Sequence, residues 1–461
     1  RKRSNNKPSQ KKQAPAKTQS KRDSDIEGDS GDDDHFNANS SAESAVESSD
    51  EEIEETAAEK RVRLAKAYLD NIEKNAEEEF GTFDAADLDR DLVAERLKKD
   101  DDESEGRLHL RVADKYNFKA DELKIQTCRG HQLPVTAVAL SEKGDVFYSA
   151  SKEGSIVKWD AKTYEKLHTF VGGRKGVKNY IGHTDHILCL AISHDGQYLA
   201  SGGRDKIINI WSVTENKHIA KFTQHRDTIS GLTFRKGSNQ LYSASHDRTI
   251  KLWNVDEKSY IETLFGHQDQ ITGIDTLGRE RCVSTGGRDK TARLWKIVEE
   301  SQLVFRGGIS TKDESGTKNV LVENSIDSVA QLDESMFVTG GDSGVLSLWE
   351  ISRKKPVFTK SLAHGLDTTQ ADIQEGRPSW ITAVASLRYS DLFFSGSWDG
   401  FVRVWKLAAD NKSFSQIAEI PVEGVVNSIQ IKTTFASKRT LLVVGVGKEL
   451  KLGRWIRMKN S

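Results

Sequence analysis

One spacing recurs four times in this chain and constrains its fold more than any other feature. A histidine is followed 28 residues later by a tryptophan in four consecutive stretches. The four pairs are His131 and Trp159, His183 and Trp211, His225 and Trp253, and His267 and Trp295. Self-similarity at a fixed period is typical of a domain assembled from repeated supersecondary units.

The residues between each histidine and tryptophan repeat as well. In the last three units an aspartate lies six residues before the tryptophan, within stretches such as SGGRDKIINIW and SASHDRTIKLW. These aspartates are Asp205, Asp247 and Asp289. Further tryptophans close similar motifs at Trp349, at Trp405 (preceded by Asp399) and at Trp455, which raises the predicted number of units to seven.

The recurring residue types have a structural explanation. A histidine, a serine or threonine, an aspartate and a tryptophan can form one buried hydrogen-bond chain that rigidifies a four-stranded blade. We therefore interpret them as scaffold residues and predict an all-β, seven-bladed WD-repeat β-propeller over residues 122–461. Residues 122–128, which alternate like a strand, are expected to complete the last blade and close the ring.

Several units depart from the regular pattern. An insertion near GGRKGVKNYI lengthens the interval between Trp159 and His183. The fifth unit lacks a Gly-His pair and carries GGISTKDESGTKN, and the sixth carries AHGLDTTQADIQEGRP. Ser343 and Glu449 stand where the fifth and seventh units should have aspartate.

The first 121 residues have a different character. Residues 1–22 hold nine Lys and Arg, and residues 23–59 hold fifteen Asp and Glu, so residues 1–51 are predicted to be a disordered arm, first basic and then acidic. The clusters Arg1-Lys2-Arg3, Lys11-Lys12 and Lys21-Arg22 suit either a nuclear import signal or a solvated basic tail. Ser24, Ser48 and Ser49 precede acidic residues, which weakly indicates phosphorylation by an acid-directed kinase.

Residues 52–121 are predicted to be a charged helical segment, because apolar side chains recur there at helical spacing. The two apolar stripes are Ile53, Ala57, Leu64, Tyr68 and Ile72, and then Leu88, Leu92, Val93 and Leu97.

The motifs argue against an enzyme. His225-Arg226-Asp227 spells a kinase triplet, but Leu232 occupies the place of the metal-binding asparagine. The glycine-rich stretch 441–450 lacks the lysine and hydroxyl spacing of a phosphate loop. Cys128, Cys189 and Cys282 form no CxxC pair and are expected to be reduced thiols. We expect no catalytic residue, cofactor, metal, small-molecule substrate or membrane span.

Charge indicates a binding function instead. The net charge of −2 divides into −10 for residues 1–121 and +8 for residues 122–461. In such propellers the residue before the aspartate emerges on one face, and basic side chains there would form an arc suited to a phosphate backbone. Ordinary surface charge, paired with the acidic arm, is the simpler alternative. The candidate RNA contacts are Lys152, Arg174, Lys175, Lys178, Arg204, Arg226, His246, Arg248 and Arg288, with Trp398 as a stacking or protein-contact platform.

Several segments resemble the WD-repeat proteins of the U3 small nucleolar ribonucleoprotein. They include EETAAEKRVRLAKAYL, VAERLKKD, LYSASHDRTIKLWNV, YIETLFGHQD, GGRDKTARLWKI, EESQLVF and VGVGKELKLGRW, and the resemblance covers residues 52–461. It implies a nuclear, nucleolar protein that binds the B/C motif of U3 RNA beside a kink-turn-binding protein and other box C/D particle proteins. It further implies a role in the small-subunit processome and in pre-ribosomal RNA processing for 18S rRNA.

A second hypothesis is a protein-only WD-repeat adaptor in a nuclear complex, such as a ubiquitin-ligase receptor or a chromatin factor. It predicts peptide binding that tolerates salt and no RNA binding. The helical segment shared with the U3 proteins argues against it.

Overall fold

The computed structural model describes residues 63, 102, 109–118, 123–173, 180–307, 309–312, 318–321, 325–367, 377–434 and 439–453. These residues form strands and turns, apart from the 3-10 helix η1 (Ala113–Lys115) and the helical residues Arg63 and Asp102. The predicted all-β class is therefore confirmed for the described chain. The arm over residues 1–51 and most of the helical segment over 52–121 lie outside the described residues.

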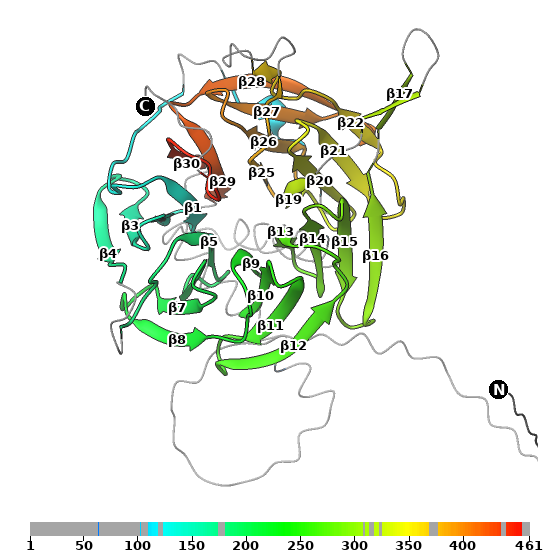
Figure 1. Ribbon diagram of the computed structural model, residues 1–461. Coiled ribbons are helices and arrows are strands. Elements are labelled where there is room, and N and C mark those ends of the chain that lie inside the picture. The colour runs from blue at the N-terminus through cyan, green and yellow to red at the C-terminus, as the bar shows by residue number, and fades with distance from the viewer. Residues whose placement is uncertain are drawn as a thin grey trace, which may run out of the picture. The chain divides into compact units, whose positions relative to one another are not determined.

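Six four-stranded antiparallel sheets, each built from consecutive strands, stand around a common axis with their first strands innermost (Figure 1). We number these sheets as blades 1 to 6. Blade 1 contains β1 (Val135–Leu140), β2 (Val146–Ser151), β3 (Ile156–Asp160) and β4 (Lys166–Phe170). Blade 2 contains β5 (Ile187–Ile192), β6 (Tyr198–Gly203), β7 (Ile208–Ser212) and β8 (His218–Phe222). Blade 3 contains β9 (Ile229–Phe234), β10 (Gln240–Ser245), β11 (Thr249–Asn254) and β12 (Ser259–Phe265).

The other half of the ring is less regular. Blade 4 contains β13 (Ile271–Thr276), β14 (Arg281–Gly286), β15 (Thr291–Lys296) and β16 (Ser301–Arg306). Blade 5 contains β19 (Ile326–Gln331), β20 (Met336–Gly341), β21 (Leu346–Glu350) and β22 (Phe358–Lys360). Blade 6 contains β25 (Ala383–Ser386), β26 (Leu392–Gly396), β27 (Phe401–Leu407) and β28 (Phe414–Pro421). The insertions form two hairpins, β17 (Ile309–Lys312) with β18 (Lys318–Leu321), and β23 (Leu366–Asp367) with β24 (Arg377–Pro378).

Burial falls from the axis of the ring outward, and this gradient explains the strand sequences. The inner strand β5 reads ILCLAI and is almost wholly buried, whereas the outer strand β12 exposes Phe265. Neighbouring blades share apolar cores, so that Ile210 of blade 2 belongs to the same buried cluster as Trp253 of blade 3. Each recurrent tryptophan therefore helps to hold two blades together.

The prediction of seven four-stranded blades is wrong in the seventh position. There, among the described residues, the sheet has only the long strands β29 (Val425–Thr434) and β30 (Arg439–Gly447). It packs between β25 and β1 and so completes the ring (Figure 1). Residues 122–128 were expected to complete this blade, but the described residues 123–128 form no strand. Cys128 packs instead against the same buried cluster of blade 1 as Leu441 and Val443.

The described residues after β30, 448–453, are held by β29 and by blade 1 and do not form a third strand of the sheet. The Asn427 side-chain amide donates to the Glu449 carbonyl oxygen at 3.0 Å. The Lys152 ammonium of blade 1 donates to the Glu449 carboxylate and to the Gly453 carbonyl oxygen, each at 3.2 Å. Trp455, the last of the seven predicted motif tryptophans, lies outside the described residues.

We call the two ends of the ring the upper and lower faces. The upper face carries the connections between blades and the turns between second and third strands, and the lower face carries the remaining turns. Residues 109–118 form a strap across the lower face. Leu110 pairs with Ser390 of blade 6, and the Asp391 carboxylate accepts hydrogen bonds from the backbone amides of Val112 and Ala113 at 2.8 and 3.0 Å.

The cysteines are free thiols, as predicted, with Cys189 and Cys282 buried and Cys128 half-buried. Burial raises the pKa of Cys189 to about 12, so its thiol stays protonated at neutral pH. Within the described chain, the structure contains no helix that is long and apolar enough to span a membrane.

Substitution of Lys152 by methionine should destabilise the ring. The ammonium group is nearly buried, so its removal takes one hydrogen-bond donor from the Glu449 carboxylate and one from the Gly453 carbonyl oxygen. We expect the free energy of unfolding to fall by about 3 kcal/mol, measured by urea denaturation. The double variant K152M/E449Q, which also removes the carboxylate charge, should recover part of this loss. Full stability of K152M would contradict this account of ring closure.

Candidate functional site

A side-chain hydrogen-bond chain connects three parts of a blade, as blade 3 illustrates. The Ser243 hydroxyl of β10 accepts a hydrogen bond from Trp253 Nε1 at 2.8 Å and lies 2.7 Å from His225 Nε2. His225 Nδ1 lies 2.9 Å from the Asp247 carboxylate. Burial opposes ionisation of Asp247, but hydrogen bonds from His225 and Thr249 outweigh it and hold the pKa of the carboxyl group well below its usual range.

Blades 2 and 4 repeat this arrangement with their own residues. In blade 2, His183 lies 2.9 Å from Asp205 and 2.8 Å from Ser201, which also accepts from Trp211. In blade 4, His267 lies 2.7 Å from both Asp289 and Ser284, and Ser284 accepts from Trp295. The residues of the spacing motif thus meet in space as a scaffold.

Two members of these chains were missed in the sequence. In blade 1, Glu153 takes the place of aspartate, and its carboxylate lies 2.9 Å from His131, while Ser149 joins His131 to Trp159. In blade 6, His364 lies 2.8 Å from Asp399 and 2.7 Å from Ser395, which accepts from Trp405. The insertion after His364 lengthens its distance from Trp405 along the chain and hides the 28-residue spacing, although the Ala-His-Gly sequence was a usable signal.

The upper face carries most of the described candidate RNA contacts. Arg204, His246 and Arg288 lie in the turns after β6, β10 and β14, in three consecutive blades, and Lys152 lies in the equivalent turn of blade 1. Arg226 follows the motif histidine of blade 3, and the Lys206 ammonium donates to its carbonyl oxygen at 2.7 Å across the boundary between blades 2 and 3. Arg204, Arg226, Arg248 and Arg288 are exposed, so their guanidinium groups are accessible on one face.

Three basic residues on this face adopt a backbone conformation that favours glycine. Lys206, Arg248 and Lys290 follow the motif aspartates of blades 2, 3 and 4, and their φ angles are 67°, 69° and 56°. The equivalent residues of blades 1 and 6 are Gly154 and Gly400. Left-handed backbone is unfavourable for a residue with a side chain, so glycine could replace each of these basic residues without backbone strain. Sequence reasoning included Arg248 but missed Lys206 and Lys290.

Other candidate contacts are placed differently from the prediction. Lys152 is only 6% exposed and binds Glu449 and Gly453, so it is unavailable to a ligand. Trp398 is 7% exposed and packs against Trp380 at 5.3 Å, which leaves no open stacking platform. Arg174, Lys175 and Lys178 lie outside the described residues.

The electrostatics of the upper face are mixed near the axis. Asp185, Asp227 and Asp269 each follow a motif histidine by two residues, and Asp269 accepts a hydrogen bond from the Arg288 backbone amide at 3.0 Å. Burial lowers the pKa of His246, although Asp227 opposes the shift, so His246 is neutral at neutral pH. Positive charge therefore resides on the arginines and lysines, and His246 contributes hydrogen bonding only.

The described residues contain no group of three or more His, Cys, Asp or Glu side chains arranged to hold a metal ion. His225 of the kinase-like triplet is a member of the blade 3 hydrogen-bond chain, and the glycine-rich stretch 441–450 contains most of β30.

Known proteins similar to this chain include a repeat family and full-length relatives. The sequence family "WD domain, G-beta repeat" matches residues 123–160, 174–212, 216–254, 258–296 and 370–406. Human "U3 small nucleolar RNA-interacting protein 2" is 44% identical over 410 residues, which cover 89% of this chain and 81% of the human protein. "Ribosomal RNA-processing protein 9" of Saccharomyces cerevisiae is 32% identical, with 87% of each chain covered.

Two solved structures agree with these relatives. "Structure of U3-55K" and "Crystal structure of RRP9 WD40 repeats" each superimpose with a TM-score of 0.65 and 42% identity. Each covers 72% of this chain, and the superposition includes 94% and 93% of the respective solved chains.

The blade motif and the ring of sheets together define a WD-repeat β-propeller. The identity to the human protein extends over most of both chains, including segments outside the repeats. The chain belongs to the family of U3 small nucleolar RNA-interacting WD-repeat proteins.

Replacement of Ser243 by alanine should destabilise blade 3, because both His225 Nε2 and Trp253 Nε1 lose a buried partner. We expect a loss of about 3 kcal/mol in the free energy of unfolding, measured by urea denaturation. The matched control is Ser259→Ala. The Ser259 hydroxyl donates to Glu257 at an exposed site, so its loss should lower the free energy of unfolding by less than about 0.5 kcal/mol. Equal stability of the two variants would refute the role of the chain.

Proposed function

We propose that this protein is a component of the U3 small nucleolar ribonucleoprotein that acts in pre-ribosomal RNA processing as a non-enzymatic scaffold binding RNA and protein. The observation that carries the proposal is the identity shared with U3 RNA-interacting and rRNA-processing proteins along most of the chain. The exposed basic face is the feature of the chain itself that fits this role.

The upper face of blades 2 to 4 is the proposed RNA contact surface. Exposed guanidinium and ammonium groups there come from rigid turns whose backbone the buried chains hold in place. Rigid cationic groups suit a phosphate backbone, because little side-chain and loop entropy is lost on binding. The proposed phosphate contacts are Arg204, Lys206, Arg226, Arg248, Arg288 and Lys290.

The more specific expectations fit the same proposal. The RNA ligand would be the B/C motif of U3 RNA, in the company of a kink-turn-binding protein and other box C/D particle proteins. The wider assembly would be the small-subunit processome, which forms 18S rRNA, and the location would be the nucleolus of the nucleus. The names of the relatives support U3 RNA as the ligand and rRNA processing as the role, and the finer partners and the location are what the resemblance to the U3 proteins implies.

A protein-only adaptor is the competing function. The distribution of the exposed basic residues over consecutive turns of one face fits an extended phosphate backbone better than a single peptide. Peptide binding by such an adaptor would depend only weakly on salt concentration, whereas RNA binding would depend on it strongly.

Ultraviolet crosslinking in nuclear extract, followed by purification of the full chain and sequencing of the bound RNA, tests the function. We expect enrichment of U3 RNA and crosslinked peptides from the turns after β6, β10 and β14. Recovery without any specific RNA would contradict the proposal and favour the adaptor.

The left-handed basic residues allow a test of the surface that does not endanger the fold. In the variant Lys206→Gly, Arg248→Gly, Lys290→Gly, three positive charges disappear and three strained backbone positions are relieved. We expect nearly unchanged stability, because relief of the left-handed backbone offsets loss of the exposed hydrogen bond from Lys206 to the Arg226 carbonyl oxygen. U3 RNA binding should be at least about tenfold weaker, with the salt dependence reduced by about one ion per lost contact.

The control for this variant is Lys258→Gly together with Asn411→Gly. Both residues also have positive φ, at 55°, but they lie in turns of the lower face. RNA binding by the control should equal that of the unmodified chain. If both variants bind alike, the upper face is not the RNA surface.

A further inference from the structure

An exposed phenylalanine ends the outer strand of blade 3. Phe265 is the last residue of β12 and is 71% exposed, more than any other aromatic residue in the described part of the chain. Its neighbour Leu264 points to the other side of the sheet and packs against the buried cluster that joins blade 3 to blade 4. The core of the propeller therefore does not use the Phe265 ring, and exposure of that ring to water is unfavourable in itself.

The Phe265 ring lies at the upper end of blade 3, on the side that faces blade 2. It pairs across the strands with Thr249, the first residue of β11, so the two side chains leave the sheet on the same side. Trp253 of β11 leaves on that side as well and belongs to the buried cluster shared with blade 2. Figure 1 shows β12 as the outermost strand of the blade, so the ring is accessible from the rim.

One carboxylate connects this strand end to two exposed arginines. Asp247 accepts hydrogen bonds from the backbone amides of Arg226 and Thr249, each at 3.0 Å. Arg248 lies between Asp247 and Thr249 in the chain. Because Asp247 also belongs to the buried hydrogen-bond chain of blade 3, the backbone at Arg226, at Arg248 and at the start of β11 is held as one rigid unit.

A third cation comes from blade 2. The Lys206 ammonium donates to the Arg226 carbonyl oxygen at 2.7 Å, across the boundary that the Phe265 ring faces. Lys206, Arg226 and Arg248 are all exposed. The carboxylate that connects them, Asp247, is occupied by hydrogen bonds from the blade itself. Basic side chains from two blades thus lie beside one exposed aromatic ring.

An aromatic ring beside cations fits a nucleotide whose base is unpaired. The ring offers a flat apolar face to the base, and the neighbouring ammonium and guanidinium groups suit the flanking phosphates. Bases inside a duplex have both faces covered by their neighbours, so only a base in a loop, a bulge or a strand end could stack on Phe265. An apolar side chain of a peptide would cover the ring but would gain nothing from the three cations.

This combination is confined to blade 3 among the four-stranded blades. The strand register gives the equivalent residues of the other five as Val171, Thr223, Arg306, Ser361 and Pro421, none of which is aromatic. The position therefore imposes no aromatic residue on the fold, and the structure predicts one stacking site of this kind.

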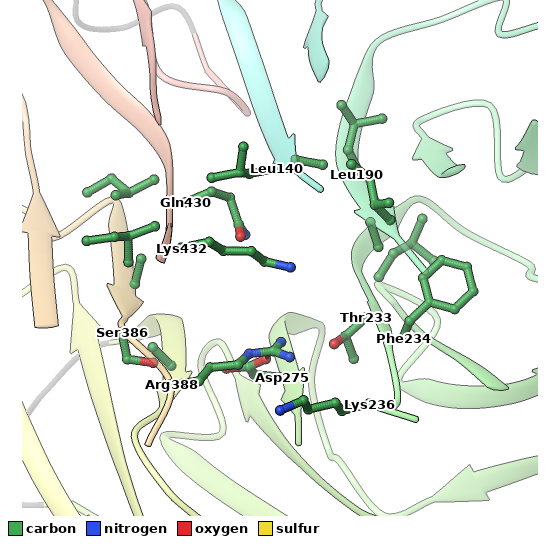
Figure 2. Close-up of a pocket in the computed structure, with 18 of the residues that line it drawn as sticks. Leu140, Leu190, Thr233, Phe234, Lys236, Asp275, Ser386, Arg388, Gln430 and Lys432 are labelled. Carbon is green, nitrogen blue, oxygen red and sulfur yellow. Dashed lines mark hydrogen bonds and ion pairs between the residues drawn. The ribbon is translucent and has the colours of Figure 1, made fainter. Parts of the chain in front are cut away.

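The basic side chains at the lower end of the ring are placed differently. Lys432 and Arg388 line a cavity of about 150 Å3 there (Figure 2). Lys432 pairs with Glu142, and the Arg388 guanidinium lies 3.5 Å from the Asp275 carboxylate. The cavity is below the ~300 Å3 at which pockets for drug-sized ligands begin, so it does not admit a nucleotide. The upper face of blade 3 is therefore the better place for an unpaired base.

We propose that Phe265 is the stacking platform for one unpaired base of the bound RNA, and that Lys206, Arg226 and Arg248 hold the phosphates on either side of that base. This inference rests on the proposed RNA-binding function. It adds to that function a single-stranded element in the ligand and the residue that recognises it.

Equilibrium binding of a U3 RNA transcript to the full chain tests the platform with three substitutions of one residue. Phe265→Ala and Phe265→Leu remove the aromatic face, and each should weaken binding about tenfold. Phe265→Trp keeps a stacking surface and should bind at least as tightly as the unmodified chain. Because the residue is exposed, the urea denaturation midpoints should be nearly unchanged. Unweakened binding by Phe265→Leu would show that stacking is not involved and would overturn the proposal.

The dependence of affinity on salt concentration separates the ring from the cations. Phe265→Ala should lower the affinity without changing the slope of log K against log salt concentration. Arg248→Gly should instead reduce that slope by about one ion. A reduced slope for Phe265→Ala would mean that the ring only positions a cation, which contradicts the platform.

Ile261→Ala is the matched control. Ile261 is an apolar residue of the same strand, 46% exposed, and lies away from the upper turns. RNA binding by this variant should equal that of the unmodified chain. An equal loss of affinity for Ile261→Ala and Phe265→Ala would assign the effect to exposed apolar surface in general and would rule out the platform.

The same measurements distinguish failure of the platform from failure of the proposed function. If the unmodified chain binds U3 RNA and all Phe265 variants bind equally well, the platform is wrong and the RNA-binding function is retained. If the unmodified chain binds no RNA, both are wrong. A photoreactive benzophenone side chain in place of Phe265, irradiated in nuclear extract, should form an adduct with RNA. An adduct with protein alone would assign the ring to a protein partner and overturn the proposal.

Discussion

A single buried hydroxyl group in the second strand of a blade determines much of this structure. In blades 1 to 4 and 6 it is a serine that accepts a hydrogen bond from the tryptophan of the third strand and meets the histidine of the loop above. Such a chain in a low-dielectric interior is stabilising only when every member is present. The loop, the turn and the third strand are thereby fixed together, and the exposed arginines occupy turns that the core holds in place.

The periodic part of the fold was predictable because its cause is local. The 28 residues between histidine and tryptophan span one loop and three strands, so any blade without an insertion in this interval repeats the spacing. His364 escaped detection because an insertion separates it from its first strand. The incomplete seventh sheet was not predictable. The chain after this sheet is held by the contact of Glu449 with Lys152, and a contact between residues so far apart in the sequence produces no repeating pattern.

The candidate site also has some features that local sequence predicts and others that depend on contacts between distant residues. The rule that the residue before the aspartate emerges on one face correctly placed Arg204 and Arg288 at the surface. It failed for Lys152, because the neighbour of blade 1 on that side is the seventh sheet, whose Glu449 draws the ammonium inward. Left-handed backbone at Lys206 and Lys290 became evident only from the φ angles, since glycine marks this position in other blades.

The strap over residues 109–118 has a consequence for how this protein connects other molecules. It is anchored by Asp391 on the lower face, while the exposed basic turns belong to the upper face. The strap itself therefore lies on the side opposite the proposed RNA surface. A ligand of the strap and an RNA on the upper face would be separated by the full height of the strands, so the two ligands need not compete for surface.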